Sequence, residues 1–271
     1  MQVVNGGWKF LAVLGCVMAC TGGSARAQGS AKDIVGTMLA NERNAAAHKD
    51  NFMYLSNERS ERTLGRLWTE RVVETPHGRV RFLMAEDGKP ISANRVQQER
   101  GRLANDVAHP EAFEQREKAQ KDEESHARQM LDLISKGFIL ENLKEEGADW
   151  RVDFRPDPNY SPSGLEQHVL HGMTGWMLIN QKQLRLHHIE GRLPKDLSIG
   201  FGLVTVHAGS NFESTKAQYD DQWRTVRVIS DIRGKAVLFK TIAKNQDVAR
   251  SEFKRVENDL TVAQAVELVE R

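Results

Sequence analysis

Four histidines in the second half of the chain have the spacing that comes closest to a metal site. His168 and His171 stand just before the stretch "TGWMLINQKQLRLHHIEG", which contains His187 and His188. Imidazole nitrogens ligate zinc in many hydrolases. In a regular β-strand, however, alternate residues share a face, so the two members of each pair point to opposite sides of the sheet. Unless the strand bulges, only one histidine of each pair can meet one of the other, with His207 as a third ligand.

The sequence therefore favours ordinary, partly exposed strand histidines over a metal-dependent hydrolase. The motifs of other enzyme classes are missing: the chain has no Gly-x-Ser-x-Gly elbow, no His-Glu-x-x-His, no Walker loop and no Gly-x-Gly-x-x-Gly. The acidic pairs Glu145-Glu146 and Asp220-Asp221 fall at expected loop tips, where carboxylates are solvated rather than held across a cleft. We predict a protein that is not an enzyme and has no catalytic residue, metal or cofactor.

The composition is that of a globular protein with a sizeable core. Apolar residues make up 39% and charged residues 28% of the 271 residues, and the formal net charge is +1. Because neither sign of charge is in excess, the sequence predicts no nucleic-acid partner.

The first 27 residues have the pattern of a secretory signal peptide. Lys9 precedes the apolar run "FLAVLGCVMAC", and a small-x-small cleavage site at residues 25–27 stands before Gln28. We therefore expect a periplasmic or otherwise exported protein. Both cysteines, Cys16 and Cys20, lie inside this segment, so a chain cleaved there has no disulfide and no cysteine-ligated zinc. The imperfect lipobox "VMAC" leaves the alternative of a membrane-anchored lipoprotein modified on Cys20.

Hydrophobic periodicity indicates helical segments near both ends and in the middle of the remaining chain, and β-prone segments between them. Apolar residues at helical spacing predict helices at 31–49, at 92–136 with a break at 105–110, and, as a short helix or a frayed end, at 260–270. Residues 51–90 have the shorter period of three antiparallel strands, with turns at 75–78 and 86–89.

The second half is almost entirely β-prone. The candidate strands are 138–145, 149–155, 167–180, 183–193, 201–207, 212–217, 223–230, 235–243 and 248–256, with tight turns at 146–147, 180–181, 208–209 and 233–234. Strands joined by tight turns are antiparallel neighbours. Residues 28–271 are therefore predicted to form a single α+β domain. Its core is a large curved antiparallel sheet, or half-barrel, with helices covering one side and a helical insertion at about 92–136.

Several of these strands are apolar on both faces, which requires that both faces be covered. Helices can close one face, and the other closes either by curling on itself or by holding an apolar ligand. We assign residues to the two faces from the alternation of side chains along each strand and from side-chain type. This predicts a cavity lined by Phe82, Met84, Trp176, Leu178, Leu186 and Leu238. Ordinary core packing would account for most of these residues as well.

The order of elements resembles the LolA/LolB-like superfamily of envelope lipoprotein carriers. In that group a strand of glycine, an apolar residue, tryptophan and further apolar residues leads into a hairpin, and Gly175, Trp176, Leu178 and Asn180 match this pattern. The resemblance implies an unclosed barrel with helices as a lid over an apolar cavity, acyl chains of lipids or lipoproteins as ligands, and no catalytic residue or metal. The charged insertion at about 92–136 departs from the family.

Three functional hypotheses remain open at this point. The leading one is a non-enzymatic carrier or sensor that binds a lipid or an acylated partner inside the half-barrel. The second is a structural or interaction protein of the cell envelope, with a filled core and a protein partner at the charged helix of residues 111–124. The third is the histidine-dependent hydrolase.

Overall fold

The structure is a computed structural model that describes residues 23–200, 202–236 and 240–271, with all side chains in these ranges except those of 23–30, 119–130, 236 and 240–244. Most of the predicted signal peptide, with Cys16 and Cys20, lies outside the described residues, as does the predicted cavity residue Leu238. None of the helices in the described ranges has the length and apolar character that crossing a bilayer requires.

The described residues contain five helices: α1 (Gly23–Ala47), α2 (Ala93–Ala108), α3 (Pro110–Gly137), α4 (Gly164–His171) and α5 (Val262–Val269). All helices predicted from the sequence are confirmed, including the break between α2 and α3. Their ends follow local chemistry, since the Ser92 hydroxyl accepts the Arg95 N–H at the start of α2 and Pro110 opens α3. Thr261 and Gln264 form a capping box at α5.

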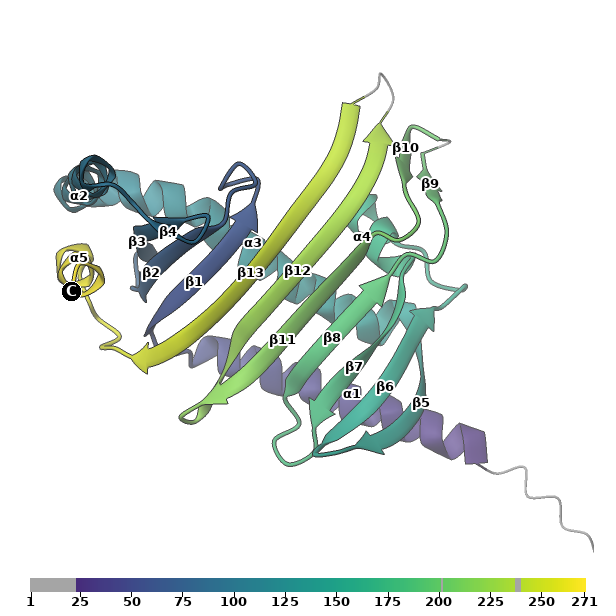
Figure 1. Ribbon diagram of the computed structural model, residues 1–271. Helices are drawn as coiled ribbons and strands as arrows, with labels where there is room; N and C mark the ends of the chain where they lie inside the picture. Colours follow the sequence, from purple (N-terminus) through teal and green to yellow (C-terminus); the bar gives the residue numbers. More distant parts are fainter. Residues whose placement is uncertain (1–22, 201, 237–239) are drawn as a thin grey trace, which may run out of the picture.

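Thirteen strands form one antiparallel sheet: β1 (Phe52–Ser60), β2 (Trp68–Glu74), β3 (Arg79–Glu86), β4 (Lys89–Pro90), β5 (Phe138–Glu146), β6 (Asp149–Pro156), β7 (Thr174–Asn180), β8 (Leu186–Arg192), β9 (Leu197–Ile199), β10 (Val204–Val206), β11 (Asn211–Tyr219), β12 (Gln222–Ala236) and β13 (Lys240–Arg255). The order is β4-β3-β2-β1-β13-β12-β11-β8-β7-β6-β5, with β9 and β10 beside β12. The last strand pairs with the first and so joins two meanders (Figure 1). The sheet is curved and does not close, which confirms the predicted α+β half-barrel.

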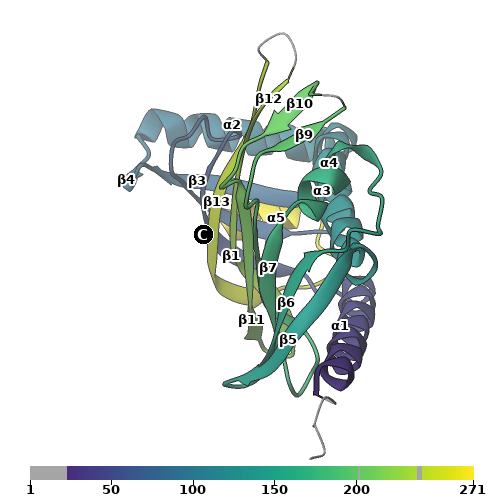
Figure 2. The ribbon, with the colours of Figure 1, turned by 90° about the vertical axis from the view of Figure 1, so that its right-hand side faces the viewer.

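Helices α1 and α3 lie on the same face of this sheet, which we call the inner face. Figure 1 shows both helices behind the strands, with α3 crossing the central strands obliquely, and Figure 2 shows both on the same side of the sheet. On β2 the neighbouring residues Val72 and Val73 point to opposite faces, and Val73 packs with α2 and α5. The opposite, outer face is therefore covered by α2 and α5 beside β1–β3.

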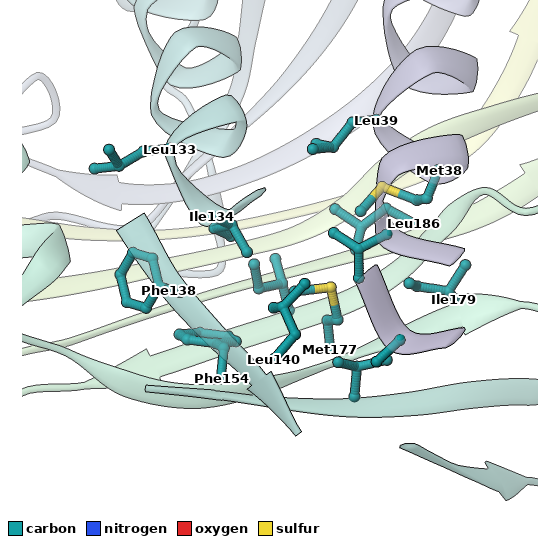
Figure 3. Packing of buried hydrophobic residues seen from close by; sticks show 14 residues of the cluster. Met38, Leu39, Leu133, Ile134, Phe138, Leu140, Phe154, Met177, Ile179 and Leu186 are labelled. Atoms are coloured by element: carbon teal, nitrogen blue, oxygen red, sulfur yellow. The ribbon is translucent and has the colours of Figure 1, made fainter. Parts of the chain in front are cut away.

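The main core fills the space between α1, the end of α3 and strands β5–β8. Figure 3 shows side chains from both helices meeting those of the strands, with Met38 of α1 and Ile134 of α3 among them. Met38, Met177 and Ile179 are completely buried. Burying side chains of this size stabilises the fold by about 1.5–3 kcal/mol each.

Strands β12 and β13 correct one prediction. The segments 223–230 and 235–243 were expected as separate strands with a turn at 233–234, but Arg233 and Gly234 lie within a single strand of 15 residues. Gly234 permits the close approach of β10, because a Cβ atom there would lie 2.5 Å from the Thr205 carbonyl oxygen. This glycine serves strand packing, not a turn.

The predicted strand at 167–180 is a second correction, because its first part is helix α4. Gly172 ends that helix, and its N–H donates to the carbonyl oxygens of His168 and Leu170. The His171 ring packs edge-on against Phe138 at 5.5 Å and beside Tyr160 at 5.4 Å. These long-range contacts favour the helical turn over the local β propensity.

Glu42 of α1 ties this helix to the β7–β8 hairpin and to β11. Its carboxylate accepts from Arg185 Nε at 2.8 Å and from the Leu186 N–H at 3.1 Å, and it pairs with Lys216. Burial raises the pKa of Glu42, but the charge of Lys216 and the hydrogen bonds from Arg185 and Lys216 outweigh it and hold the pKa below its ordinary value.

We expect Glu42→Gln to lower the free energy of unfolding by about 2 kcal/mol, because it removes charge-assisted hydrogen bonds from a mostly buried site. Urea titration near neutral pH measures the change. The control is Asp132→Asn, which breaks a more exposed 2.7 Å pair between α3 and Arg43 of the same helix and should cost less than about 1 kcal/mol. Equal losses of unfolding free energy in the two variants would contradict the conclusion that the buried Glu42 carboxylate ties α1 to the sheet.

Candidate functional site

The upstream histidines do not face a common point. His168 and His171 lie on helix α4 instead of a strand, and their ring nitrogens contact the Gly164 carbonyl oxygen at 2.7 Å and the Asp157 carbonyl oxygen at 3.2 Å. His207 pairs instead with Asp196, with 3.5 Å between Nδ1 and Oδ2. Across the described ranges, no three His, Cys, Asp or Glu side chains form a group that could hold a metal ion.

The expectation that His187 and His188 point to opposite faces is wrong, because β8 bulges there. His188 pairs with Leu178 of β7, whereas Leu186 pairs with Ile179, which leaves His187 as the extra residue. Leu186 and Ile189 both belong to the core under α1. The two histidines between them therefore lie on the outer face.

The residues predicted to line a cavity are not brought together. Trp176 and Leu178 alternate with core residues of β7 and lie on the outer face, while Leu186 is buried under α1. The parity assignment that grouped Leu186 with the other two is wrong because of the same bulge. Phe82 packs in the separate core with α2 and α5, and Met84 is half-buried further along the same strand.

On the outer face, Trp176 is held by paired polar side chains. The Arg151 guanidinium lies 4.1 Å from its ring centroid, His188 stacks on it at 4.6 Å, and its Nε1 donates to Glu190. Arg151 also pairs with Asp153 at 3.2 Å. The contacts of Trp176 with Arg151, His188 and Glu190 run between neighbouring strands, and such cross-strand pairs are typical of a solvated sheet face.

The inner face of the central strands is different, because it lies between two separate cores. The core under α1 ends at Ile189 of β8 and the partly buried Phe212 of β11. The second core on this face consists of Phe52, Tyr54 and Val72 on β1 and β2. The strands between these cores are crossed by α3 (Figure 1).

Small and apolar side chains cover the inner face of the sheet between the two cores. Ser214 pairs with Ile189, Val228 with Ser214, and Val248 with Val228, so all of them share the inner face. Val228 and Ser230 are only half-buried although they stand on a central strand. We call Ser214, Val228, Ser230 and Val248 the central strip.

Four aromatic rings lie on the same face next to the central strip. The Phe253 centroid is 5.0 Å from that of Tyr54, 4.6 Å from that of Tyr219 and 6.2 Å from that of Phe52. These offset and edge-on arrangements are the favourable ones for aromatic pairs. We call Phe52, Tyr54, Tyr219 and Phe253 the aromatic cluster.

Phe253 reaches this cluster because β13 bulges before it. Leu55 pairs with Ser251, whereas Met53 pairs with Lys254, and Glu252 between them has φ 58°. The bulge places residues 248 and 250 on the same face as 253 and 255. Without it, Phe253 would point to the outer face.

Three arginines stand over the aromatic cluster. The Arg224 guanidinium lies 4.6 Å from the Phe52 centroid, Arg255 lies 5.8 Å from the same ring, and Arg250 lies 5.7 Å from the Tyr54 centroid. Each such contact contributes about 0.5–2 kcal/mol. Rings that bear guanidinium groups present both an apolar surface and hydrogen-bond donors for an anion.

Glu74 at the end of β2 holds this arrangement together. Its carboxylate is 4% exposed and accepts from the Phe52 N–H at 3.1 Å, from Lys49 at 3.2 Å and from Arg224. Burial raises the pKa of Glu74, but the charges of Lys49, Arg224 and Arg79 outweigh it and hold the pKa below its ordinary value.

No family model, curated protein or solved structure matches this chain, so the inner-face site stands on its own geometry.

Proposed function

We propose that the protein is an exported, non-enzymatic carrier or sensor that binds the acyl chain of a lipid or of an acylated partner on the inner face of the half-barrel. The observation that carries the proposal is that Val228 and Ser230 of the central strip are only half-buried between two filled cores, whereas Val248 beside them is buried. Val228 stands on a central strand and yet is not fully covered. An acyl chain laid along it would gain about 0.8 kcal/mol for every methylene group that it buries.

Two further points support this function. The aromatic cluster extends the apolar floor beyond the central strip and offers rigid, flat surfaces for a flexible chain. An unclosed sheet with helices lying over its inner face, as α1 and α3 do here, is also the architecture that the resemblance to LolA/LolB-like carriers implies. The predicted signal peptide suits a periplasmic carrier, and anchoring through Cys20 stays the alternative.

Uptake of an uncharged fluorescent acyl probe tests the proposal. The wild-type protein should bind a pyrene-labelled long-chain alcohol, and Val228→Asp should weaken this binding by about tenfold or more, because a carboxylate on the floor opposes burial of an acyl chain. Ile229→Asp is the matched control, since Ile229 is the next residue, is similarly half-buried and points to the outer face.

The two variants should lose similar amounts of thermal stability. A difference between them in probe binding then shows which face of the sheet binds the probe, because it cannot come from a difference in folding. A wild-type protein that purifies without lipid and takes up no probe would refute the carrier function. If both substitutions weakened probe binding equally, the binding surface would not be on the inner face.

An interaction protein of the envelope is the second candidate. It is favoured by the filled core under α1, where Val35, Met38 and Met177 have no exposed surface, and by the paired charges around Trp176 on the outer face of β6–β8. Cross-linking from the outer face, for example at Ile229→Cys, would then capture a protein partner while the acyl probe stays unbound.

A further inference from the structure

Arg250 of β13 stands where the central strip meets the aromatic cluster. It pairs with Ser56 of β1, is two residues from Val248 on the same face, and has its guanidinium 5.7 Å from the Tyr54 centroid. The side chain is half-buried. A group bound to Arg250 would therefore contact both the apolar floor and the aromatic rings.

The two other arginines of the site are neutralised by carboxylates. Arg224 pairs with the buried Glu74, and Arg255 pairs with Asp50 at 3.1 Å and with Asp221. Within the described part of the chain, Arg250 has no carboxylate partner.

The nearest acid on the inner face of β1 is already occupied. Glu58, which pairs across the sheet with Val248, accepts from Arg62 at 2.6 Å and from the Ser60 hydroxyl at 2.5 Å. Arg62 thus pairs with both Glu58 and Glu70 further along the face. Among the side chains that the structure describes, no acid is therefore left to pair with Arg250, and its positive charge is available to a bound group.

A partly desolvated guanidinium without a counter-ion is unfavourable, and folded proteins seldom bury a charge that is not paired. Its planar fork of N–H donors matches the two oxygens of a carboxylate or phosphate, with which it forms paired, charge-assisted hydrogen bonds. The cation–π contact with Tyr54, at 5.7 Å from the ring centroid, holds the guanidinium beside the aromatic cluster.

We propose that Arg250 binds the anionic head group, a carboxylate or a phosphate, of an amphiphile whose acyl chain lies along the central strip. The inference rests on the proposed function and specifies its ligand class. An acyl chain that runs past Val248 and Val228 toward the core under α1 places its head at Arg250.

Competition against the uncharged pyrene probe tests this ligand class. For ligands of the same chain length, the wild-type protein should bind a fatty acid or a lysophosphatidic acid at least tenfold more tightly than the corresponding fatty alcohol. Arg250→Gln should abolish this preference by weakening acid binding at least tenfold more than alcohol binding, and Arg250→Lys should keep part of it, because an ammonium supplies the charge but not the fork.

Arg227→Gln is the matched control. Arg227 is on the neighbouring strand, pairs with Asp247 at 2.8 Å and points to the outer face, so its replacement should leave the preference intact. A preference for the phosphate alone identifies a phospholipid head, and one for the carboxylate alone identifies a fatty acid. Equal affinity of acid and alcohol for the wild type would overturn the head-group assignment while the carrier function stands, whereas no binding of either ligand would overturn the carrier function itself.

Discussion

Glu74→Gln is expected to lower the free energy of unfolding by about 3 kcal/mol or more, one of the two largest effects in the molecule. The substitution keeps the size of the side chain but leaves the charges of Lys49 and Arg224 unpaired in a buried site, and breaking a buried ion pair costs about 3–5 kcal/mol. The loss also loosens the junction of α1, β1, β2 and β12, since Glu74 contacts residues from each of these segments or their ends. Chemical denaturation at neutral pH measures it.

The pH dependence provides an independent check. The folded state lowers the pKa of Glu74, so its stabilising contribution is present above the pKa of an unfolded glutamate, about 4.3, and is lost as pH falls through the folded pKa. The difference in stability between wild type and variant should therefore shrink as the pH is lowered from about 5. Glu141→Gln is the control, because Glu141 pairs with Arg155 at 3.1 Å in an exposed site and should contribute less than about 1 kcal/mol at any pH. A constant difference down to pH 3 would show that the carboxylate charge is not what stabilises the junction.

The local elements were predictable because their signals are local. The turn at 75–78 is closed by Thr75, whose N–H and hydroxyl both donate to the Gly78 carbonyl oxygen, and Gly78 adopts φ 156° there. Pro110 separates α2 from α3 for an equally local reason, its fixed φ and missing N–H. The half-barrel followed from the number of such hairpins and from the apolar faces of their strands.

The site was not predictable because it depends on pairings between distant segments. The aromatic cluster unites Phe52 and Tyr54 with Tyr219 and Phe253, some 165 positions or more apart, and no periodicity shows that β13 lies beside β1. The alternation of Phe52 and Tyr54 was the one usable signal, since it places two rings on one face of β1.

β-Bulges were the main reason why the alternation of side chains along a strand assigned residues to the wrong face of the sheet. At His187 and at Glu252 one extra residue reverses the face of everything that follows on the strand. Leu186 was assigned to the wrong face for this reason, and Phe253 and Arg250 could not be grouped. A bulge leaves only a weak sequence signal at residues other than glycine, because its cost is met by the packing of neighbouring strands.

The second large effect is expected at Gly175, which marks the closest approach of strands β7 and β8. A Cβ atom on Gly175 would lie 1.9 Å from the Glu190 carbonyl oxygen, 2.8 Å from the Gly191 Cα and 2.7 Å from Cζ of Phe154. Two of these atoms belong to the backbone of the paired strand, so a rotamer change cannot relieve the overlap. Strands β7 and β8 would have to separate, and this movement would disturb the core under α1 and the bulge at His187.

Gly175→Ala should therefore destabilise the protein by about 3 kcal/mol or more, above the usual 1–3 kcal/mol range for overpacking because backbone atoms must move. Gly36→Ala is the matched control: Gly36 lies inside α1, and a Cβ atom there has no neighbour within 4 Å. Alanine in a helix interior is better than glycine by about 0.5–1 kcal/mol, so this second substitution should raise the unfolding midpoint. Thermal melts of the two variants measure shifts of opposite sign, and a Gly175→Ala protein as stable as the wild type would mean that β7 and β8 are not paired in the register that places His188 opposite Leu178.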